Sequence, residues 1–374
     1  MSTPRVTVVH ERLTEVAGSE RVVEQVVAAL PGSRVVVPIA DPAARPAGLE
    51  GVEVSTGPLQ RLYRGGGRYA HLLPLLPLAM RHADLGRPDA VVASHHAFAL
   101  RVRPPDGVPM VGYVHSPARW IWDPAMLAGE VGGRVGETGL RAFAATQRRA
   151  DRRAAQRPEL LLANSSTVAD RIRRWWHRDA EVLHPPVRTD LFTTDPATSR
   201  EDFFLMAGRL VPYKRPEAAV RAARLAGVRL VVAGDGRAMA ACRAEAGPGT
   251  ELVGRVDDAT MIDLMRRARA LVFPGVEDFG IVPVEAMACG TPVVAQAAGG
   301  ALDSVVEGVS GTLVESGDDG GGLAEALAAA LGDFDDTRYD AAAVRRHAEG
   351  FGEQRFRDGV RSAVERVLGG SISG

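Results

Sequence analysis

The sequence predicts an α/β protein with two domains, each a doubly wound parallel sheet with helices on its faces. Three observations predict this class. The chain has 374 residues, which suits two domains of similar size. Short apolar runs alternate with amphipathic helical stretches, as in sheets with helical crossovers. A proline-rich and polar stretch near the middle interrupts this alternation, which then restarts.

The first half of the chain is expected to form one of these domains. Its apolar runs predict strands over Val6–His10, Arg34–Pro38, Asp89–Ser94, Pro109–His115 and Leu160–Asn164. A helix is predicted to open at Ser19, a residue type that caps helix N-termini, and to carry valines and Leu30 at helical spacing. The most apolar stretch, 71–80, contains two prolines and is far shorter than the roughly 20 residues that span a bilayer.

The second half repeats this pattern after a linker that we expect at His184–Pro186 and Thr193–Arg200. Strands are predicted over Phe203–Met206, Arg229–Ala233, Glu251–Val253, Ala270–Phe273, Pro292–Ala295 and Gly311–Val314. A glycine and aspartate turn at 317–322 precedes an alanine-rich helix, and a helix over roughly 353–368 follows near the end of the sequence.

The composition excludes several classes of protein. With 46% hydrophobic and 24% charged residues the chain is globular, and its net charge of −1 supplies no basic field for nucleic acid. Two scattered cysteines form neither a disulfide framework nor a zinc set, which fits a reducing cytosol. No signal peptide precedes the first strand, so a cytoplasmic location is expected; peripheral contact with the inner face of a membrane stays open.

The segment Pro274–Val294 carries the strongest site signal. Ligands of open α/β sheets bind beyond the carboxyl ends of strands, and this segment follows a predicted strand. Glu277 lies in the loop, a helix is expected to begin near Pro283, and Gly290 is a suitable stop. Glu285 is then expected in the first helical turn, where the free backbone N–H groups favour a phosphate. Two carboxylates beside a phosphate site predict partners that are hydroxyl donors, such as a ribose and a sugar.

The second site signal is a basic segment that follows the strand ending at Gly208. Arg209 and Lys214 lie on its connecting loop, where two cations can clamp a diphosphate and stabilise it as it leaves. Lys214 is the only lysine among 45 basic residues, which argues against an ordinary solvated basic loop.

Weaker signals follow other strands. Gly234 ends one strand, and Gly254 with Arg255 ends another, where the backbone could read a base edge. Gly18, ahead of the first helix, would let a phosphate approach the backbone. His115 ends a predicted strand, at the edge of the cleft that two such domains would form between them. No two histidines have metal-ligand spacing, and no metal is predicted.

Together these segments resemble glycosyltransferase family 4, which has the GT-B fold of two Rossmann-like domains facing a central cleft. The specific part is the Glu277–Glu285 pair, which matches the paired-glutamate motif of the family. The chain also resembles the mannosyltransferase-like members of polysaccharide assembly, through the stretch from His115 to Asp123, Asn164-Ser, Pro185-Pro-Val and the Arg209–Arg215 loop. Ala17 departs from the family's frequent glycine pair, as do Ala118 and Arg119 after Pro117, and both departures bear on the acceptor.

The resemblance implies domains at 1–188 and 189–352, with the helix 353–369 packing back on the first, acceptor-side domain. Arg209 and Lys214 would bind the donor diphosphate, Glu285 the ribose, and Glu277 the transferred sugar. The amides of Phe279, Gly280 and Ile281 would assist Glu277, His115 would lie against the sugar, and Gly18 would approach the diphosphate. The implied catalytic set is His115, Glu277, Arg209 and Lys214; the implied donor-binding set adds Gly18, Gly208, Gly234, Gly254, Arg255, Phe279, Gly280, Ile281 and Glu285.

The expected function is therefore a retaining, metal-independent transfer of a hexose from a nucleotide diphosphate sugar, with GDP-mannose as the first guess. A UDP-linked glucose-type donor and a specialised deoxysugar donor stay open. The expected acceptor is a hydroxyl of a glycan, a lipid-linked saccharide or a natural product. The first half holds all the tryptophans and many arginines, which could dock an anionic lipid-linked acceptor; a solvated helix face is the competing interpretation. These residues are Trp120, Trp122, Trp175, Trp176, the run 148–157, Arg61, Arg64, Arg68 and Arg81.

Three alternatives stay open at this point. One is another GT-B enzyme, such as a sugar-nucleotide epimerase or a phosphorylase. A second is a non-catalytic subunit that binds a nucleotide sugar, against which the intact glutamates and cations argue. A third is a scaffolding protein, which would not need polar residues clustered at strand ends.

Overall fold

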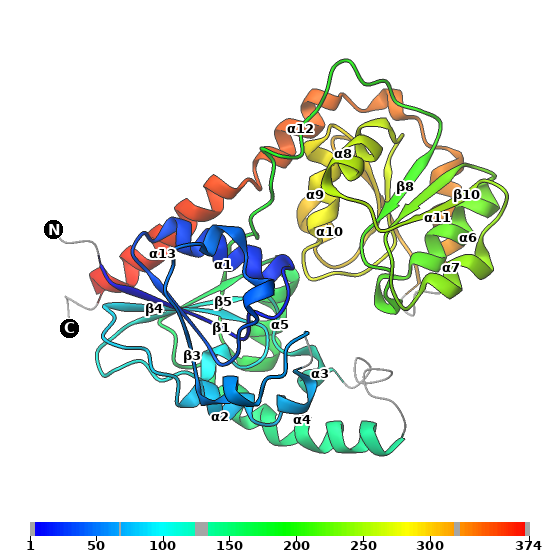
Figure 1. Ribbon diagram of the computed structural model, residues 1–374. Helices are drawn as coiled ribbons and strands as arrows, with labels where there is room; N and C mark the ends of the chain where they lie inside the picture. Colours follow the sequence, from blue (N-terminus) through cyan, green and yellow to red (C-terminus); the bar gives the residue numbers. More distant parts are fainter. Residues whose placement is uncertain (1–3, 67–68, 124–133, 318–321, 371–374) are drawn as a thin grey trace. The chain divides into compact units, whose positions relative to one another are not determined.

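A computed structural model describes residues 4–66, 69–123, 134–317 and 322–370 of the chain (Figure 1). Two compact units make up the chain: unit 1 is Met1–Pro186 with Gln354–Gly374, and unit 2 is Val187–Glu353. Arg68 and most of the turn predicted at 317–322 lie outside the described residues. Within the described part, no helix combines the length and the apolar character that crossing a membrane requires.

Unit 1 contains a parallel sheet in the order β3-β2-β1-β4-β5-β6-β7. Its described strands are β1 (Val6–His10), β2 (Arg34–Val37), β3 (Val54–Thr56), β4 (Ala90–His95), β5 (Met110–Val114), β6 (Leu160–Ala163) and β7 (Glu181–Val182). Its helices are α1 (Gly18–Ala29), α2 (Leu76–Arg81), α3 (Arg119–Trp122), α4 (Arg134–Ala154), α5 (Ser166–Trp176) and α13 (Glu353–Gly370). Short 3-10 turns occur at Pro42–Ala44, Ala47–Leu49, Pro58–Leu62, Ala70–Leu72 and Ala99–Arg101.

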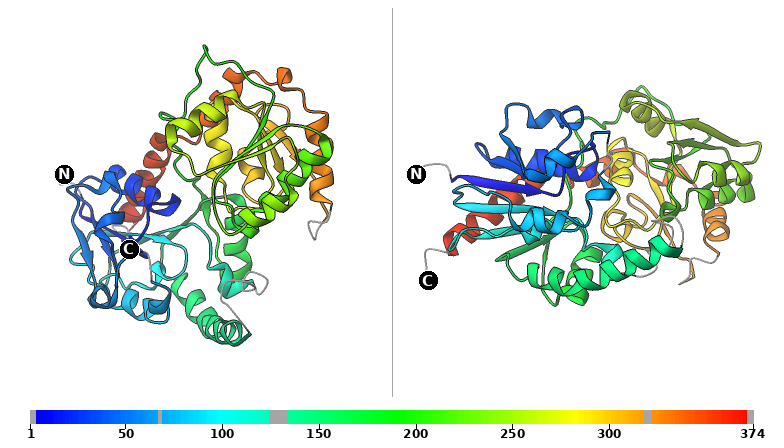
Figure 2. Two further views of the ribbon diagram at one scale, coloured as in Figure 1. Left: turned by 45° about the vertical axis from the view of Figure 1, so that its right-hand side comes forward. Right: turned by 60° about the horizontal axis from the view of Figure 1, so that its bottom comes forward.

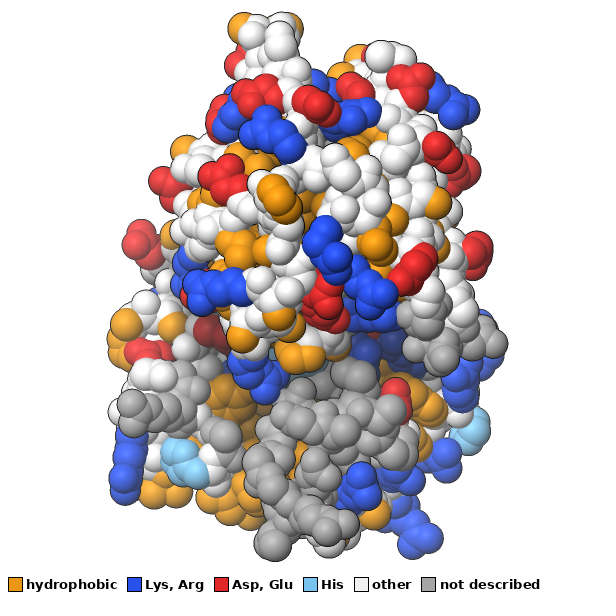
Figure 3. Space-filling view, turned by 90° about the vertical axis from the view of Figure 1, so that its right-hand side faces the viewer, with side chains coloured by type: hydrophobic (Ala, Val, Ile, Leu, Met, Phe, Trp, Pro, Cys, Tyr) orange, Lys and Arg blue, Asp and Glu red, His pale blue; other side chains and the backbone are white. Residues whose placement is uncertain are grey.

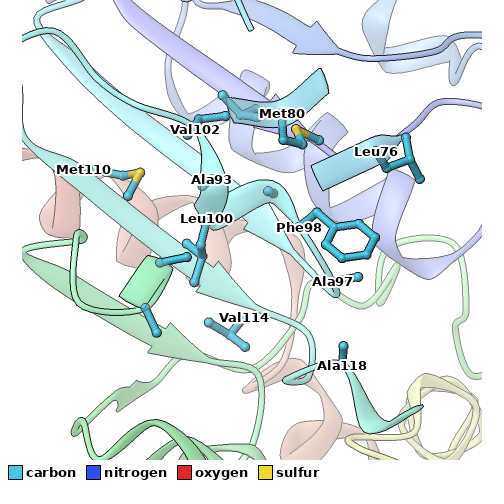
Figure 4. Close-up of a cluster of buried hydrophobic side chains, with 14 of the residues drawn as sticks. Leu76, Met80, Ala93, Ala97, Phe98, Leu100, Val102, Met110, Val114 and Ala118 are labelled. Carbon is cyan, nitrogen blue, oxygen red and sulfur yellow. The ribbon is translucent and has the colours of Figure 1, made fainter. Parts of the chain in front are cut away.

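Helices cover both faces of this sheet. On one face α1 and α13 lie side by side, and Val23 and Phe356 join the inward side chains of β1 in one buried cluster (Figures 1 and 2). The opposite face packs against α2, α4 and α5. Figure 4 shows part of this second cluster, in which Phe98, just after β4, lies between Leu76 of α2 and Val114 of β5. The clusters hold β1, β4 and β5 in place, and with them the residues at their carboxyl ends.

Unit 2 contains a second parallel sheet, in the order β10-β9-β8-β11-β12-β13. Its described strands are β8 (Phe204–Ala207), β9 (Leu230–Ala233), β10 (Thr250–Gly254), β11 (Leu271–Phe273), β12 (Val293–Gln296) and β13 (Gly311–Val314). Its helices are α6 (Pro216–Ala226), α7 (Met239–Glu245), α8 (Asp258–Arg267), α9 (Ile281–Ala288), α10 (Ala301–Ser304), α11 (Leu323–Gly332) and α12 (Ala341–Glu349), with 3-10 turns at Pro212–Lys214 and Asp336–Arg338. One face packs against α6, α7 and α11, and the other against α8, α9, α10 and α12. The predicted class of two doubly wound α/β sheets is confirmed.

Two helices start one or two residues before their predicted positions. The first helix begins at Gly18 with Ala17 as its N-cap, so Ser19 lies inside the helix. The carboxylate of Glu20 reaches back to accept the Ala17 amide at 3.1 Å, which replaces the expected serine cap. The helix α9 begins at Ile281 and not near Pro283, so Glu285 is its fifth residue and lies beyond the first turn. Pro216 opens α6, where the fixed φ of proline suits the first helical turn.

The segment Thr193–Arg200, predicted as part of the linker, belongs to unit 2. Side chains fix it there: Arg266 donates to the Thr193 carbonyl at 2.7 Å, and Arg200 donates to the Gly290 carbonyl at 2.6 Å. The division between the units falls at Pro186, within the proline-rich stretch.

Candidate functional site

Each sheet has one place where successive strands switch to the opposite side, and open α/β sheets bind ligands beyond such points. In unit 1 the switch lies between β1 and β4, and in unit 2 between β8 and β11. The loops that follow β8 and β11 carry Arg209, Lys214 and Glu277. The strand ends of β1 and β4 carry His10 and Ser94. Both switch points therefore hold polar side chains.

The predicted glycines of unit 2 let neighbouring loops approach closely. Gly234 has φ of +153°, and a Cβ on it would lie 1.8 Å from the Gly208 carbonyl oxygen. Its amide donates to the Gly254 carbonyl at 2.7 Å. The backbone turns after β8, β9 and β10 are thus in contact, and only glycine fits the middle position.

Lys214 and Glu277 meet across the switch point of unit 2. The ammonium nitrogen of Lys214 lies 2.8 Å from Oε1 of Glu277, and the two side chains are 12% and 17% exposed. The Oε1 atom makes this ion pair without a hydrogen bond to any described residue. Gly275 permits the approach, because a Cβ there would lie 2.8 Å from the Lys214 Cα. Two groups that the sequence assigned to a diphosphate and to a sugar therefore neutralise each other in the protein alone.

Arg209 and Arg255 are exposed, and Arg209 makes no side-chain hydrogen bond or ion pair with the described residues. Arg209 comes after Gly208, the residue that follows β8, and a Cβ on Gly208 would lie 3.9 Å from the Lys214 ammonium nitrogen. An exposed guanidinium without a partner is available to an anion. On the face drawn in Figure 3, described cationic and anionic side chains are interspersed.

The loop from Glu277 to Gly280 leads into α9. Gly280 is the N-cap of that helix, with φ of +84° and no side-chain cap on the first amides of α9. Behind the loop lie Gly299 and Gly300: the Gly300 amide donates to the Glu277 carbonyl at 2.9 Å, and a Cβ on Gly300 would lie 2.2 Å from the Phe279 Cα. Phe279 is buried in the unit 2 core. The uncapped amides at the start of α9 suit an anionic or hydroxyl ligand.

Glu285, on α9, faces a different cation from Glu277. Its Oε1 is 3.8 Å from a guanidinium nitrogen of Arg188, which also pairs with Asp258 at 2.7 Å. The Glu285 side chain is 14% exposed. The cation that it faces, Arg188, was not among the predicted site residues. Long-range pairing of this kind leaves no signal in residue spacing.

In unit 1, His115 belongs to a buried polar chain. Its Nε2 lies 2.8 Å from the Ser94 hydroxyl, and that hydroxyl lies 3.1 Å from Nδ1 of His10. Nε2 of His10 lies 3.4 Å from Oε1 of Glu20. Burial, together with the neighbouring His10, lowers the pKa of His115 to about 3. Burial opposes the charge on Glu20, but hydrogen bonds from His10 and Ser19 outweigh it and lower the pKa of Glu20 to about 2.

Two further groups border this chain. His96, whose pKa burial and the Arg12 cation hold well below its usual range, lies with its ring 5.5 Å from that of His10. Arg12 contacts His96 Nε2 at 3.0 Å and lies over the Tyr69 ring. Gly18, predicted to approach a phosphate, is the first residue of α1, two positions before Glu20.

Sequence reasoning missed His10, Ser94 and Glu20 in unit 1 and Arg188 in unit 2. His10 and Ser94 could have been found, because both are polar residues at the carboxyl ends of apolar strands that adjoin the switch point. Within the described ranges, no three His, Cys, Asp or Glu side chains gather as a metal ion would require.

Two family models match most of the chain. A model described as glycosyl transferases group 1 matches residues 188–345, and a model described as glycosyltransferase family 4 matches residues 16–191. A D-inositol 3-phosphate glycosyltransferase of Mycobacterium avium is 35% identical over 195 residues, which cover 46% of this chain and 46% of that relative. The chain thus spans less than half of the length of the curated relatives it matches.

Solved structures share the fold over nearly the whole chain. The Anabaena protein Alr3699/HepE in complex with UDP superimposes with a TM-score of 0.66 at 21% identity, covering 98% of this chain and 100% of that one. Its complex with UDP-glucose gives a TM-score of 0.64 at 21% identity, over 98% and 99% of the two chains. At this identity the likeness establishes the arrangement of the elements and nothing about the ligand of this chain.

Proposed function

Because this chain belongs to glycosyltransferase family 4 and has the GT-B fold, we propose that it transfers a glycosyl group from a nucleotide diphosphate sugar to a hydroxyl acceptor. The observation that carries the proposal is the arrangement at the switch point of unit 2. Lys214 and Glu277 form an ion pair at 2.8 Å there, and the unpartnered Arg209 follows the adjacent strand. Cations and a carboxylate within one loop cluster match a ligand that carries both phosphates and hydroxyls.

In this proposal Arg209 meets the donor diphosphate first, because it has no competing partner among the described residues. The diphosphate then draws Lys214 away from Glu277, and the released carboxylate accepts hydrogen bonds from hydroxyls of the sugar. Glu285 and Arg188 hold the nucleoside end, with Glu285 accepting from ribose hydroxyls. The loop amides of Phe279 to Ile281 assist at the sugar, and the backbone at Gly234, Gly254 and Arg255 faces the base.

The chemical step that we propose is a front-face displacement with retention. The bond between the anomeric carbon and the diphosphate oxygen breaks as the acceptor oxygen bonds to the same face of that carbon. The acceptor proton passes to the departing phosphate. Arg209 and Lys214 stabilise the negative charge that develops on the diphosphate, which is the role a metal ion would otherwise fill. The reaction is accordingly proposed to run without a metal.

The donor is proposed to be a hexose nucleotide. GDP-mannose follows from the resemblance to mannosyltransferase-like members, and UDP-glucose is the competing donor because the Anabaena relative was solved with it. For the acceptor we propose an anionic hydroxyl compound, on the surface of unit 1. The D-inositol 3-phosphate named for the relatives and a lipid-linked saccharide at the inner membrane face are the two forms to compare.

Thermal stabilisation by GDP, UDP, ADP and dTDP in the presence of a chelator tests the donor site. A nucleotide at 100 times its dissociation constant should add about 2.7 kcal/mol to the free energy of unfolding. The effect should be lost in Lys214→Ala and Arg209→Ala. It should persist in Arg221→Ala, which removes an exposed charge of α6 that pairs with Glu325. Stabilisation by no nucleotide, or equal stabilisation of all variants, would contradict the site.

Product analysis separates the alternatives. Release of nucleotide that requires an acceptor identifies a transferase. An epimerase would convert the donor without an acceptor, a phosphorylase would need inorganic phosphate, and a non-catalytic subunit would bind the nucleotide without turnover. NMR of the anomeric proton in the first product decides between retention and inversion.

A further inference from the structure

Four side chains of unit 1 form one continuous chain of polar contacts. It runs from Glu20 on α1 to His10 at the end of β1, then to Ser94 on β4, and ends at His115 after β5. The separations are 3.4, 3.1 and 2.8 Å in that order. Three different strands and a helix contribute, so the chain exists only in the folded unit.

Water has no access to the first three members. Glu20, His10 and Ser94 are each 0% exposed, so each must satisfy its hydrogen bonds within the chain. The second oxygen of Glu20 is occupied, because it accepts the Ala17 amide at 3.1 Å and the Ser19 hydroxyl at 2.9 Å. The first oxygen therefore serves His10.

Because these side chains can bond only to one another, the donor and the acceptor of each hydrogen bond in the chain are fixed. A carboxylate accepts and never donates, so Glu20 requires the proton of His10 on Nε2. Neutral His10 then has a lone pair on Nδ1, which accepts a hydrogen bond from the Ser94 hydroxyl. The Ser94 hydroxyl has one proton, and it donates this proton in the hydrogen bond to His10. The Ser94 oxygen must therefore accept a hydrogen bond from Nε2–H of His115. His115 is thereby left with a lone pair on Nδ1, for which the described residues offer no partner.

We propose that Glu20, His10 and Ser94 form a relay that fixes the tautomer of His115, so that its Nδ1 accepts a hydrogen bond from a hydroxyl of the transferred sugar. This inference rests on the proposed function for the role of His115. Ser94 and His10 are positioning residues in it, because they act through His115.

The variant Glu20→Gln tests the relay, because it reverses the direction of the hydrogen bonds while the side chain at position 20 keeps its shape. The glutamine oxygen should stay with the two donors at Ala17 and Ser19, which places its amide against His10 Nε2. His10 should then hold its proton on Nδ1, and His115 should switch from the Nε2–H to the Nδ1–H tautomer. Nitrogen-15 spectra of the full chain, recorded at a pH where His10 is neutral, report the tautomers of both histidines without any substrate.

Two further variants complete the test. Ser94→Ala breaks the relay, so the double variant Glu20→Gln/Ser94→Ala should show the same His115 tautomer mixture as Ser94→Ala alone. Glu15→Gln is the matched control: Glu15 pairs with Arg12 outside the relay and should leave the His115 tautomer unchanged. A His115 tautomer that is the same in the wild type and in Glu20→Gln would overturn the relay.

Donor kinetics then test the consequence. Glu20→Gln should lower kcat/KM for the donor by about tenfold to a hundredfold, the effect of one mismatched hydrogen bond at a sugar hydroxyl. A tautomer switch with unchanged kcat and KM would overturn the positioning role. Absence of transfer by the wild type would instead remove the proposed function, and the spectra would still decide the relay.

Discussion

The ammonium group of Lys214, after β8, lies 2.8 Å from Oε1 of Glu277, after β11. Both side chains are mostly buried, and the pair spans the switch point of the unit 2 sheet. A buried charge that loses its partner is costly, whereas removing both charges together is often neutral. Each charge of the pair therefore depends on the other in the protein alone, and a ligand that separates them can engage both.

Removing Lys214 should destabilise unit 2 because Glu277 keeps a buried charge. We expect Lys214→Met to cost about 1–3 kcal/mol and the double variant Lys214→Met/Glu277→Gln to recover most of that loss. Hydrogen exchange of the β8 and β11 amides measures this in unit 2. The control Arg221→Met breaks an exposed pair with Glu325 and should cost no more than about 0.5 kcal/mol. Equal losses in the single and double variants would show that the pair is not coupled.

Gly300 should tolerate no side chain, because it supports the loop that carries Glu277. A Cβ at Gly300 would lie 2.2 Å from the Phe279 Cα and 2.3 Å from the Phe279 carbonyl oxygen. Backbone atoms cannot move aside cheaply, so Gly300→Ala should cost more than about 3 kcal/mol or shift the Glu277 loop. Gly332→Ala is the control, since a Cβ there meets nothing within 4 Å. Nucleotide binding that survives Gly300→Ala at full strength would be incompatible with a site on this loop.

The stability of unit 1 should fall as the pH decreases from about 6.5 towards about 3, the pKa of His115 in the folded protein. Burial lowers the pKa of His95, His96 and His115, the last to about 3, so these groups stay neutral when folded and bind protons when unfolded. The unfolded state then binds more protons, and stability decreases as the pH falls, by up to about 1.4 kcal/mol per pH unit for each histidine. Urea unfolding followed by tryptophan fluorescence measures unit 1 selectively, because all four tryptophans lie in it.

The contribution of Glu20 lies in a lower pH window that overlaps the histidine window. Its pKa is lowered to about 2, so its stabilisation is present above the ordinary carboxyl pKa and is lost as the pH falls from about 4.5 towards 2. His115→Gln should therefore reduce the slope by about one proton near pH 5 and leave the Glu20 loss towards pH 2 in place. A slope above pH 5 that His115→Gln leaves unchanged would mean that His115 is not held neutral.

Most of the strands could be predicted because their residues are apolar and buried on both faces. The strand β1, with its five buried residues, is an example. The strands β3 and β7 could not, because edge strands need no apolar run: β7 consists of two exposed residues, Glu181 and Val182. These two strands pair through backbone groups, which the sequence pattern does not reveal.

The predicted site residues fall into two groups. Lys214 and Glu277 stood out in the sequence because one is the single lysine and the other follows a strand, and the fold brings them together. The partners of Glu285 and His115 could not be found, because Arg188 and Ser94 reach them only through the folded arrangement of distant segments. The roles of these residues in binding stay predictions that the experiments above test.

Glu11 should be the most sensitive carboxylate of unit 1. Its Oε1 accepts the amides of Ala97 at 2.7 Å, Phe98 at 2.5 Å and Ala99 at 2.8 Å, and so fixes the turn that follows β4. Glu11→Ala would leave these buried amides without an acceptor, at an expected cost of at least about 3 kcal/mol.

Glu11→Gln keeps an oxygen in place and loses only the charge, so it should cost about 1–2 kcal/mol. Trp120 reports the change, because its ring lies 6.0 Å from that of Phe98 in the same turn. Glu15→Ala, on a side chain that is 49% exposed, is the control and should stay within about 0.5 kcal/mol of the wild type. If Glu11→Ala and Glu15→Ala unfold at the same urea concentration, the amides after β4 find another acceptor and Glu11 does not hold the turn.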